Sequence, residues 1–294
     1  CEIHYHDIGD YLTRERKLEI LKEAVSIQHI KWEQITPNEK ADWINQRGGV
    51  FDTLTPLAPE KKFDTGTKSL FETNAIGVAT NRDSWVYSFS EKNLQKNMKS
   101  CVDFYNSQRE LYKKAVKSGK KLEDILSSDP TKISWTHNLK RSLERNKAIE
   151  FLDENVFISM YRPFTKANFY FSRELNERVF KFPSFFPNKN IKNIVIVITG
   201  RGEDKDFSAL ICHNISELKL LYNSQCFPLY LYEETSTEAK SDDLFNQTEN
   251  NTTGEKYTRK DAISDEGLKH FQDAHPNETI NKEDIFYYVY GLLH

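Results

Sequence analysis

Residues 158–171 read ISMYRPFTKANFYF, and this aromatic stretch decides how the surrounding chain folds. The apolar side chains in its first half, together with Phe157 just before it, favour a buried strand. Pro163 has a fixed φ and keeps Arg162 out of the helical region, so the strand runs out extended or turns there. A second strand, predicted at residues 168–172, follows after a few polar residues. The pattern indicates a β-hairpin.

Arg162 stands among the aromatic residues at the lip of this hairpin. Its guanidinium is always protonated, and such a group needs a partner where water is excluded. A carboxylate within the chain would serve, and so would an anionic group on a ligand outside it. The sequence leaves both alternatives open.

The 294 residues, 34.5 kDa in mass, suffice for a large core divided into two or more subdomains. No apolar run approaches the 18 residues of a membrane span, and no signal peptide is present. We expect a cytoplasmic protein that has no membrane partner. The chain begins in a predicted strand and ends inside an apolar helical pattern, which is typical of a piece of a longer polypeptide.

The four cysteines, Cys1, Cys101, Cys212 and Cys226, show no CxxC spacing. Cys101 falls on the apolar face of a predicted helix, and Cys212 and Cys226 fall in strand-like runs. This distribution favours buried free thiols in a reducing cytosol.

The net charge of -3 hides an uneven distribution of charged residues. Residues 91–147 contain fourteen Lys or Arg against seven Asp or Glu, and residues 159–205 contain nine against four. Residues 233–266 reverse the balance, with four against ten. An anion-binding face beside a solvated acidic linker has this distribution, and so does a mixed helix surface.

Helix and strand patterns are mixed along the chain, which predicts an α+β fold with a mixed or antiparallel sheet, a helical coupler segment and C-terminal helices. Helices are predicted at residues 13–25, 91–117, 122–127, 133–146, 264–274 and 282–294. Further strands are predicted at residues 2–8, 191–199, 207–212 and 226–232.

Residues 76–90, IGVATNRDSWVYSFS, predict two strands around a polar turn at Thr80 to Ser84. Pro228 indicates that its strand lies at the edge of a sheet. Residues from about 233 to 262 include a stretch that is poor in hydrophobic side chains and rich in polar ones, so we expect a flexible surface linker there.

Catalytic motifs are missing from the sequence. The run IVIVITGRG at residues 194–202 lacks the third glycine of GxGxxG, and GxxxxGK[ST] does not occur. The eight histidines are scattered and do not have metal-ligand spacing. We expect no catalysis by this fragment alone.

Three blocks together resemble one family. They are HYHDIGDYLTRERKLEIL (residues 4–21), TNRDSWVYSFS with FYNSQ (80–90 and 104–108), and MYRPFTKANFYF with CFPLYLY and DIFYYVYGLLH (160–171, 226–232 and 284–294). As a set and in this order, they resemble the C-terminal part of type ISP restriction-modification enzymes. Such single-chain bacterial enzymes join a nuclease, an ATP-driven translocase, an adenine methyltransferase, a coupler and a target-recognition domain.

The resemblance implies a domain order and partners. Residues 1–25 would be the tail of the methyltransferase fold, 26–148 the coupler and the start of the recognition region, and 149–294 the target-recognition domain. The partners would be double-stranded DNA and the methyltransferase and translocase domains of the same parent chain. The parent would use S-adenosylmethionine, ATP and Mg²⁺, and this fragment would bind no cofactor.

A methyltransferase must take its target base out of the stack, so another surface has to hold the duplex and read its sequence. Holding phosphates needs Lys and Arg, and reading base edges needs Arg, Asn, Gln or Asp on loops. The candidate DNA-binding residues are Asn81, Arg82, Asp83, Arg162, Arg173, Asn176, Arg178 and Arg201.

Five of these candidates have a structural alternative. Arg82 and Asp83 would pair with each other or close their turn, Arg173 and Arg178 would be solvated surface charges, and Arg162 would hold the scaffold. The corresponding alternative for the whole chain is a segment that couples the methyltransferase and translocase domains without reading DNA. A third alternative is an enzyme such as a nuclease.

Overall fold

The computed structural model describes residues 2–39, 41–44, 46, 50, 53–59, 68–235 and 256–293. The chain divides into two compact units, Cys1–Thr55 and Pro56–His294. Both contain helices and β-sheets, so the predicted α+β fold is confirmed. The resemblance places domain limits after residues 25 and 148, and those limits stay predictions.

The first unit contains a short antiparallel strand pair and one helix. Strand β1 (Ile3–Tyr5) pairs with β2 (Glu33–Ile35). Helix α1 (Arg14–Glu23) starts as predicted at Thr13, whose hydroxyl accepts a hydrogen bond from the Arg16 amide. A 3₁₀ turn, η1 (Ile27–His29), follows. Helix α1 buries none of its side chains within the described residues.

In the second unit, the predicted hairpin is the centre of one four-stranded sheet, ordered β4-β6-β5-β9. Its strands are β4 (Tyr87–Ser88), β5 (Val156–Arg162), β6 (Thr165–Tyr170) and β9 (Ile215–Ser216), with β5 and β9 parallel. The second hairpin strand starts earlier than predicted. Arg162 pairs with Thr165, so Pro163 and Phe164 alone form the turn.

A second four-stranded sheet has the order β3-β10-β7-β8. Its strands are β3 (Ala75–Ile76), β7 (Val195–Ile198), β8 (Ala209–Cys212) and β10 (Gln225–Pro228). The edge position expected from Pro228 is wrong, because β10 pairs on both sides. Proline is tolerated because β3 pairs only with Gln225 and Cys226 and ends before Pro228.

Part of the predicted linker at residues 233–262 is an antiparallel strand pair. Strands β11 (Tyr230–Glu234) and β12 (Tyr257–Asp261) pair along their whole lengths. Lys260 of β12 lies across from Leu231, and its side chain forms an ion pair with Glu233 of β11 at 2.6 Å. Residues 236–255 lie outside the described residues.

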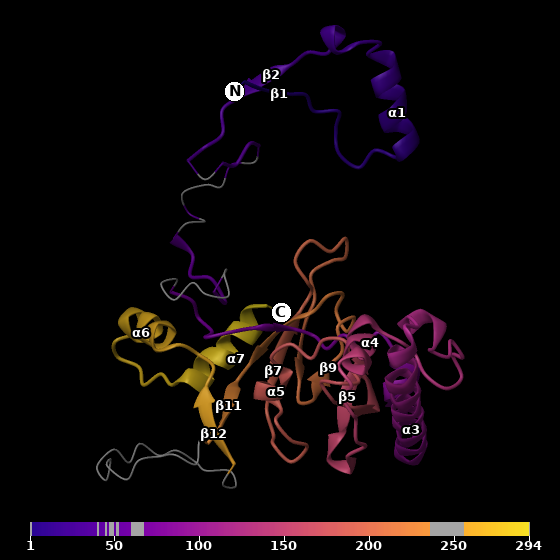
Figure 1. The fold of residues 1–294 in the computed structure, drawn as a ribbon. Helices are drawn as coiled ribbons and strands as arrows, with labels where there is room; N and C mark the ends of the chain where they lie inside the picture. The colour runs from indigo at the N-terminus through magenta and orange to yellow at the C-terminus, as the bar shows by residue number, and fades with distance from the viewer. Residues whose placement is uncertain are drawn as a thin grey trace. The chain divides into compact units, whose positions relative to one another are not determined.

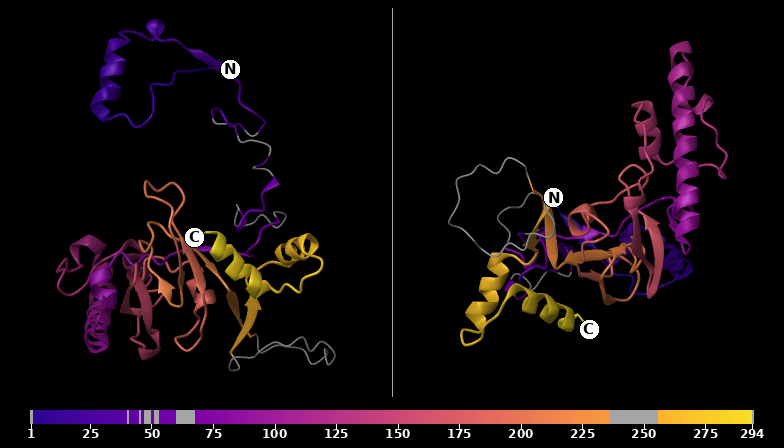
Figure 2. Two further views of the ribbon diagram at one scale, coloured as in Figure 1. Left: turned by 180° about the vertical axis from the view of Figure 1, so that it is seen from behind. Right: turned by 90° about the horizontal axis from the view of Figure 1, so that it is seen from below.

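The longer helices of the second unit gather at its two ends, with the strands and a short helix between them (Figure 1). Helix α3 (Glu91–Ala115) begins after Ser90 as predicted, and Figure 2 shows it extending past the strands. The remaining helices and turns are α2 (Asp83–Val86), η3 (Val116–Ser118), η4 (Leu122–Asp124), α4 (His137–Glu144), η5 (Asp153–Asn155), α5 (Phe182–Phe185), α6 (Asp265–Ala274) and α7 (Lys282–Leu292). No helix of the described part is long and apolar enough to cross a membrane.

Two buried apolar clusters stabilise the second unit. The larger joins α3 and α4 to the hairpin sheet through side chains such as Met98, Leu139 and Phe169. The smaller joins β10 and the C-terminal helices around Phe71 and Phe286. Each fully buried side chain of this kind contributes roughly 1.5–3 kcal/mol.

The buried thiols belong to this interior as predicted. Cys101, Cys212 and Cys226 are free and buried, and Cys1 lies outside the described residues. Burial raises the pKa of Cys101 to about 11 and that of Cys212 to about 12.

Candidate nucleic-acid interface

Arg162 ends strand β5 and has a carboxylate partner within the chain. Its Nη1 donates to Oε2 of Glu217 at 2.9 Å and to the Tyr161 carbonyl at 2.7 Å. Its Nη2 lies 3.8 Å from Oδ2 of Asp83, and the guanidinium stacks 4.0 Å from the Tyr161 ring centroid. The internal alternative is therefore what the structure shows. The side chain is still 42% exposed, so its outer edge is open to a ligand.

Glu217 is the buried member of this ion pair, with a side chain that is 7% exposed. Burial raises the pKa of Glu217 to about 7, although Arg162 and the Lys219 amide, 2.7 Å away, favour the charged form. The Glu217 backbone also bonds to Met160 and pairs with Val78. Glu217 therefore connects the end of β5 to its own segment and to the segment of Val78.

The turn before α2 lies next to this ion pair. The Thr80 hydroxyl donates to the Asp83 carboxylate, and the Arg82 amide donates to Thr80 Oγ1 at 3.2 Å. These bonds start α2, so the predicted second strand is wrong at Trp85 and Val86 and is formed only at Tyr87 and Ser88. Ala79 forms an isolated antiparallel bridge with Arg178. The structure thus brings Asn81, Asp83, Arg162 and Arg178 around one turn.

Arg82 and Asn176 were expected on loops open to a groove, and for their side chains this is wrong. Arg82 is 3% exposed, and its Nη2 donates to Thr136 Oγ1 at 2.7 Å. Asn176 is also buried, and its Oδ1 accepts from the Ser172 amide at 2.9 Å. Burial lowers the pKa of Arg82, while nearby Glu177 raises it. Both residues connect segments of the interior.

Arg173, Arg178 and Arg201 are exposed. Within the described residues, none of their side chains forms a hydrogen bond or an ion pair. They are free to contact an anion, or to remain solvated.

A concave surface of about 830 Å³ opens beside the hairpin tip. We call it the hairpin-tip groove, and it is lined by residues 162–164, 208–210 and 219–222 and by Tyr290. The loop that carries Arg201 adjoins it, because the Gly200 amide donates to the Tyr222 carbonyl at 3.0 Å. Arg162 and the Arg201 loop, forty residues apart in sequence, thus border one surface.

Phe164, Lys219 and Tyr222 line the groove, and Lys205 and Asn223 lie against Tyr222 and Lys219. The sequence analysis missed all five. Lys205 Nζ lies 5.8 Å from the Tyr222 ring centroid, and Lys219 Nζ donates to Asn223 Oδ1 at 3.0 Å. One signal was present in the sequence: a Pro–Phe pair stands where a two-residue turn favours glycine in second place.

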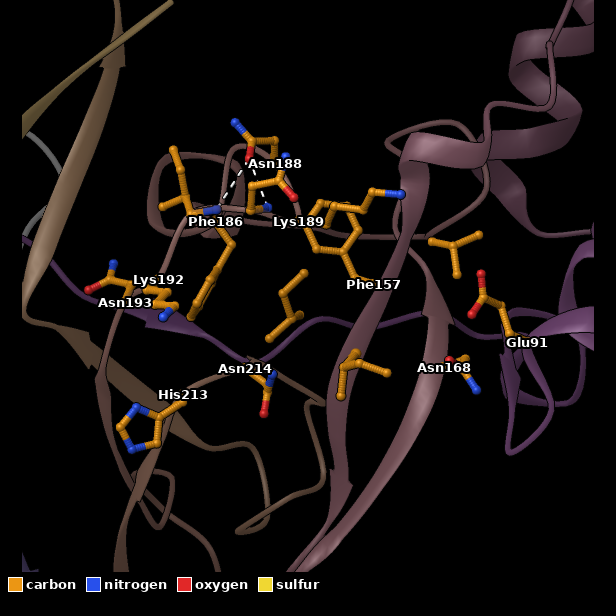
Figure 3. Close-up of a pocket in the computed structure, with 15 residues that line it drawn as sticks. Glu91, Phe157, Asn168, Phe186, Asn188, Lys189, Lys192, Asn193, His213 and Asn214 are labelled. Carbon is orange, nitrogen blue, oxygen red and sulfur yellow. Dashed lines mark hydrogen bonds between the residues drawn. The ribbon is translucent and has the colours of Figure 1, made fainter. Parts of the chain in front are cut away.

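A second cavity, of about 530 Å³, is rich in asparagine (Figure 3). Most of its amides are used by the fold. Asn193 Nδ2 donates to the Phe185 and Tyr230 carbonyls, Asn168 Nδ2 to those of Ser88 and Phe89, and Asn188 Oδ1 accepts two backbone amides. Lys189, Lys192 and His213 are exposed around it. No metal-binding group of three His, Cys, Asp or Glu was found in the described ranges.

Sequence comparison identifies the family to which this chain belongs. The model of the Type ISP C-terminal specificity domain matches residues 69–294. The chain is therefore a member of that family, in agreement with the resemblance of its three sequence blocks. A search of curated proteins found no match.

Three solved structures match the whole chain. The first is a nuclease-deletion mutant of the Type ISP restriction-modification enzyme LlaGI in complex with a DNA substrate mimic, at 35% identity and a TM-score of 0.73. The ATP-dependent Type ISP enzyme LlaBIII bound to DNA matches at 32% and 0.75. The DrdV–DNA complex matches at 30% and 0.78. This chain spans 24%, 18% and 27% of their respective lengths.

Proposed function

We propose that this chain is the module with which a restriction-modification enzyme recognises its duplex DNA target and positions it for adenine methylation and restriction. One observation carries the proposal. The chain belongs to a specificity-domain family, and three structures that match its whole length, at 30–35% identity, are of enzymes in complexes with DNA or a DNA mimic.

The described surface offers the chemistry that such a module needs. The outer edge of Arg162, Lys219 and the Arg201 loop border the hairpin-tip groove, and Arg178 bridges Ala79 beside the turn next to Arg162. Cations in this arrangement bind phosphates, which fixes the protein on the duplex, while side chains between them reach the bases.

The remaining parts of the proposal concern the parent enzyme. The methyltransferase and translocase domains would be partners within one chain. S-adenosylmethionine, ATP and Mg²⁺ would bind in those domains, and we propose no site for them among the described residues. The parent would act in the bacterial cytoplasm, where its DNA is.

The salt dependence of DNA binding tests the proposal in the full-length enzyme. The slope of log K against log salt is negative, and each lost phosphate contact lowers its magnitude by about 0.9. We expect Arg201→Ala and Arg178→Ala each to lower the magnitude of the slope by about that amount. Arg145→Ala removes an exposed arginine beyond the end of α4 and is the matched control, with an unchanged slope.

Two results would contradict this function. One is a full-length enzyme that still methylates its own site after deletion of this chain. The other is equal salt slopes for all three arginine variants and the wild type. Either result would favour a segment that couples the other domains without touching DNA.

A further inference from the structure

Phe164 is an unusual residue for the end of a β-hairpin. Its side chain is 93% exposed, and its backbone is left-handed, with φ of 61°. It follows Pro163 in the two-residue turn, at a position that favours glycine when φ is positive. Phenylalanine there strains the backbone and adds almost nothing to the buried core. The fold itself therefore gives no reason for this side chain.

Tyr222 is a second aromatic residue of the hairpin-tip groove on a left-handed backbone, with φ of 54°, and Asn223 follows with φ of 52°. The Tyr222 side chain is 47% exposed. The loop at Gly200 packs directly against this turn. The two are so close that a Cβ on Gly200 would collide with the backbone oxygens of Tyr222 and Asn223. The ring is thus presented from a turn that is packed on one side.

Bulky residues at positive φ are outliers, and such strained positions gather where proteins bind ligands. Two of them at one groove, both with exposed rings, indicate binding through ring faces and edges. The surface is preorganised, because the strain is already present in the unbound protein.

The charged groups beside the rings indicate the class of ligand. Lys205 approaches the Tyr222 ring, Lys219 lies on the same turn, and Arg162 borders the groove next to Phe164. Aromatic rings flanked by cations are complementary to bases flanked by phosphates. Arg162 and Lys205 already pair with Glu217 and Asp204, but a purely apolar protein segment would offer no anion to the exposed edges of these cations or to Lys219.

We infer that Phe164 inserts between two base pairs of the bound duplex, and that Tyr222 provides a stacking surface beside it. This inference rests on the proposed function and adds the manner of contact. An inserted apolar side chain unstacks one base step and bends the duplex. Local unstacking also lowers the energy needed to extrude a base for methylation.

The test uses the full-length enzyme and duplexes that contain its methylated site, mapped by sequencing DNA that it has modified. 2-Aminopurine replaces one base at a time outside the methylated adenine. We expect a fluorescence rise at one step with the wild type and with Phe164→Trp. Phe164→Ala should lose this rise and bind roughly tenfold more weakly with an unchanged salt slope.

Phe89→Ala is the matched control, because Phe89 is 77% exposed and does not line the groove. Thermal unfolding of every variant is measured in parallel. Wild-type affinity and fluorescence in Phe164→Ala would overturn the insertion and leave the proposed function intact. A Phe164→Ala enzyme that is destabilised but gives unchanged fluorescence would also overturn the insertion. In that case the ring would contact another domain of the enzyme.

Failure of the proposed function is distinguishable from these results. In that case the wild-type enzyme itself would bind the mapped duplex and a scrambled duplex equally well. That result would overturn the proposed function and the insertion together.

Discussion

Arg82 and Phe164 occupy the opposite environments to those that hydropathy assigns them. Arg82 is 3% exposed, and Phe164 is 93% exposed. Arginine is almost never fully buried without a partner, whereas phenylalanine is among the residues most often buried. Arg82 is itself a candidate DNA contact in the sequence, and Phe164 lies two residues after another, Arg162, yet the two side chains have different roles.

The difference lies in what each side chain gives the fold. Arg82 donates from its backbone to Thr80 and from its side chain to Thr136, so it joins the turn before α2 to the start of α4. Phe164 costs backbone strain and has almost no contact to offset it. The contacts of Arg82 within the chain account for its presence. The strain at Phe164 is not offset by such contacts, so we infer that its ring contacts a partner outside the chain.

The largest expected effect is on the free energy of unfolding, and it tests the role of the buried residue, Arg82. Arg82→Met keeps the volume but removes the cation near Glu177 and the donor to Thr136. We expect the free energy of unfolding to fall by about 2 kcal/mol, because Thr136 loses its donor and the half-buried Glu177 carboxylate loses a nearby cation. Urea denaturation of the 294-residue chain measures it, with Arg145→Met as an exposed control that should change stability by less than about 0.5 kcal/mol.

Adding Glu177→Gln to Arg82→Met should recover part of this loss, since the uncompensated charge is then gone. An Arg82→Met protein with unchanged stability but weaker DNA binding would reverse the comparison. Arg82 would then reach DNA, as the sequence first indicated.

The next largest effect is a pH dependence of the free energy of unfolding, which arises from Glu217, the partner of Arg162. Burial raises the pKa of folded Glu217 to about 7 from an ordinary value of 4.5, so the folded state binds the proton more tightly. The stabilisation that comes from this tighter proton binding is therefore fully present below pH 4.5 and is lost as pH rises to about 7. The slope is at most about 1.4 kcal/mol per pH unit, and Glu217→Gln should remove it.

Urea denaturation at a series of pH values between 4.5 and 7 measures this slope in the wild type and in Glu217→Gln. A wild-type stability that instead rises over this range, with the rise absent in Glu217→Gln, would show that pairing with Arg162 outweighs burial.

The smallest effect has the opposite sign. Phe164→Gly should raise the free energy of unfolding by about 1 kcal/mol, because glycine adopts positive φ without the clash of a Cβ. The same variant should bind DNA more weakly, since the ring is gone. Thermal unfolding measures the gain, and a loss of stability would mean that the ring packs against the protein.

The elements that were predicted well are those whose information is local. Ser90 accepts from the Asn93 amide, and apolar residues recur every three or four positions behind it, so α3 was readable from sequence. Asn281 likewise forms a capping box at the start of α7. The hairpin at residues 156–170 followed from its aromatic strands and Pro163.

The rest depended on tertiary contacts. Burial of Arg82 requires Thr136, fifty-four residues away, and the hairpin-tip groove is built from four separate segments that meet only in the fold. Pro228 indicated an edge strand because the early end of β3 is not visible in sequence. Arg162, Asp83 and Arg201 were predicted as DNA contacts from the sequence and stay predictions, whereas the aromatic residues of the groove were not predicted.

The structure of the full-length enzyme bound to its own methylated duplex tests the central claim most directly. The quantity to measure is the distance from the Phe164 ring to the nearest base. We predict van der Waals contact, about 4 Å, with the side chain of Arg82 still buried against Thr136. A duplex held elsewhere, with Phe164 packed against another domain, would contradict the account.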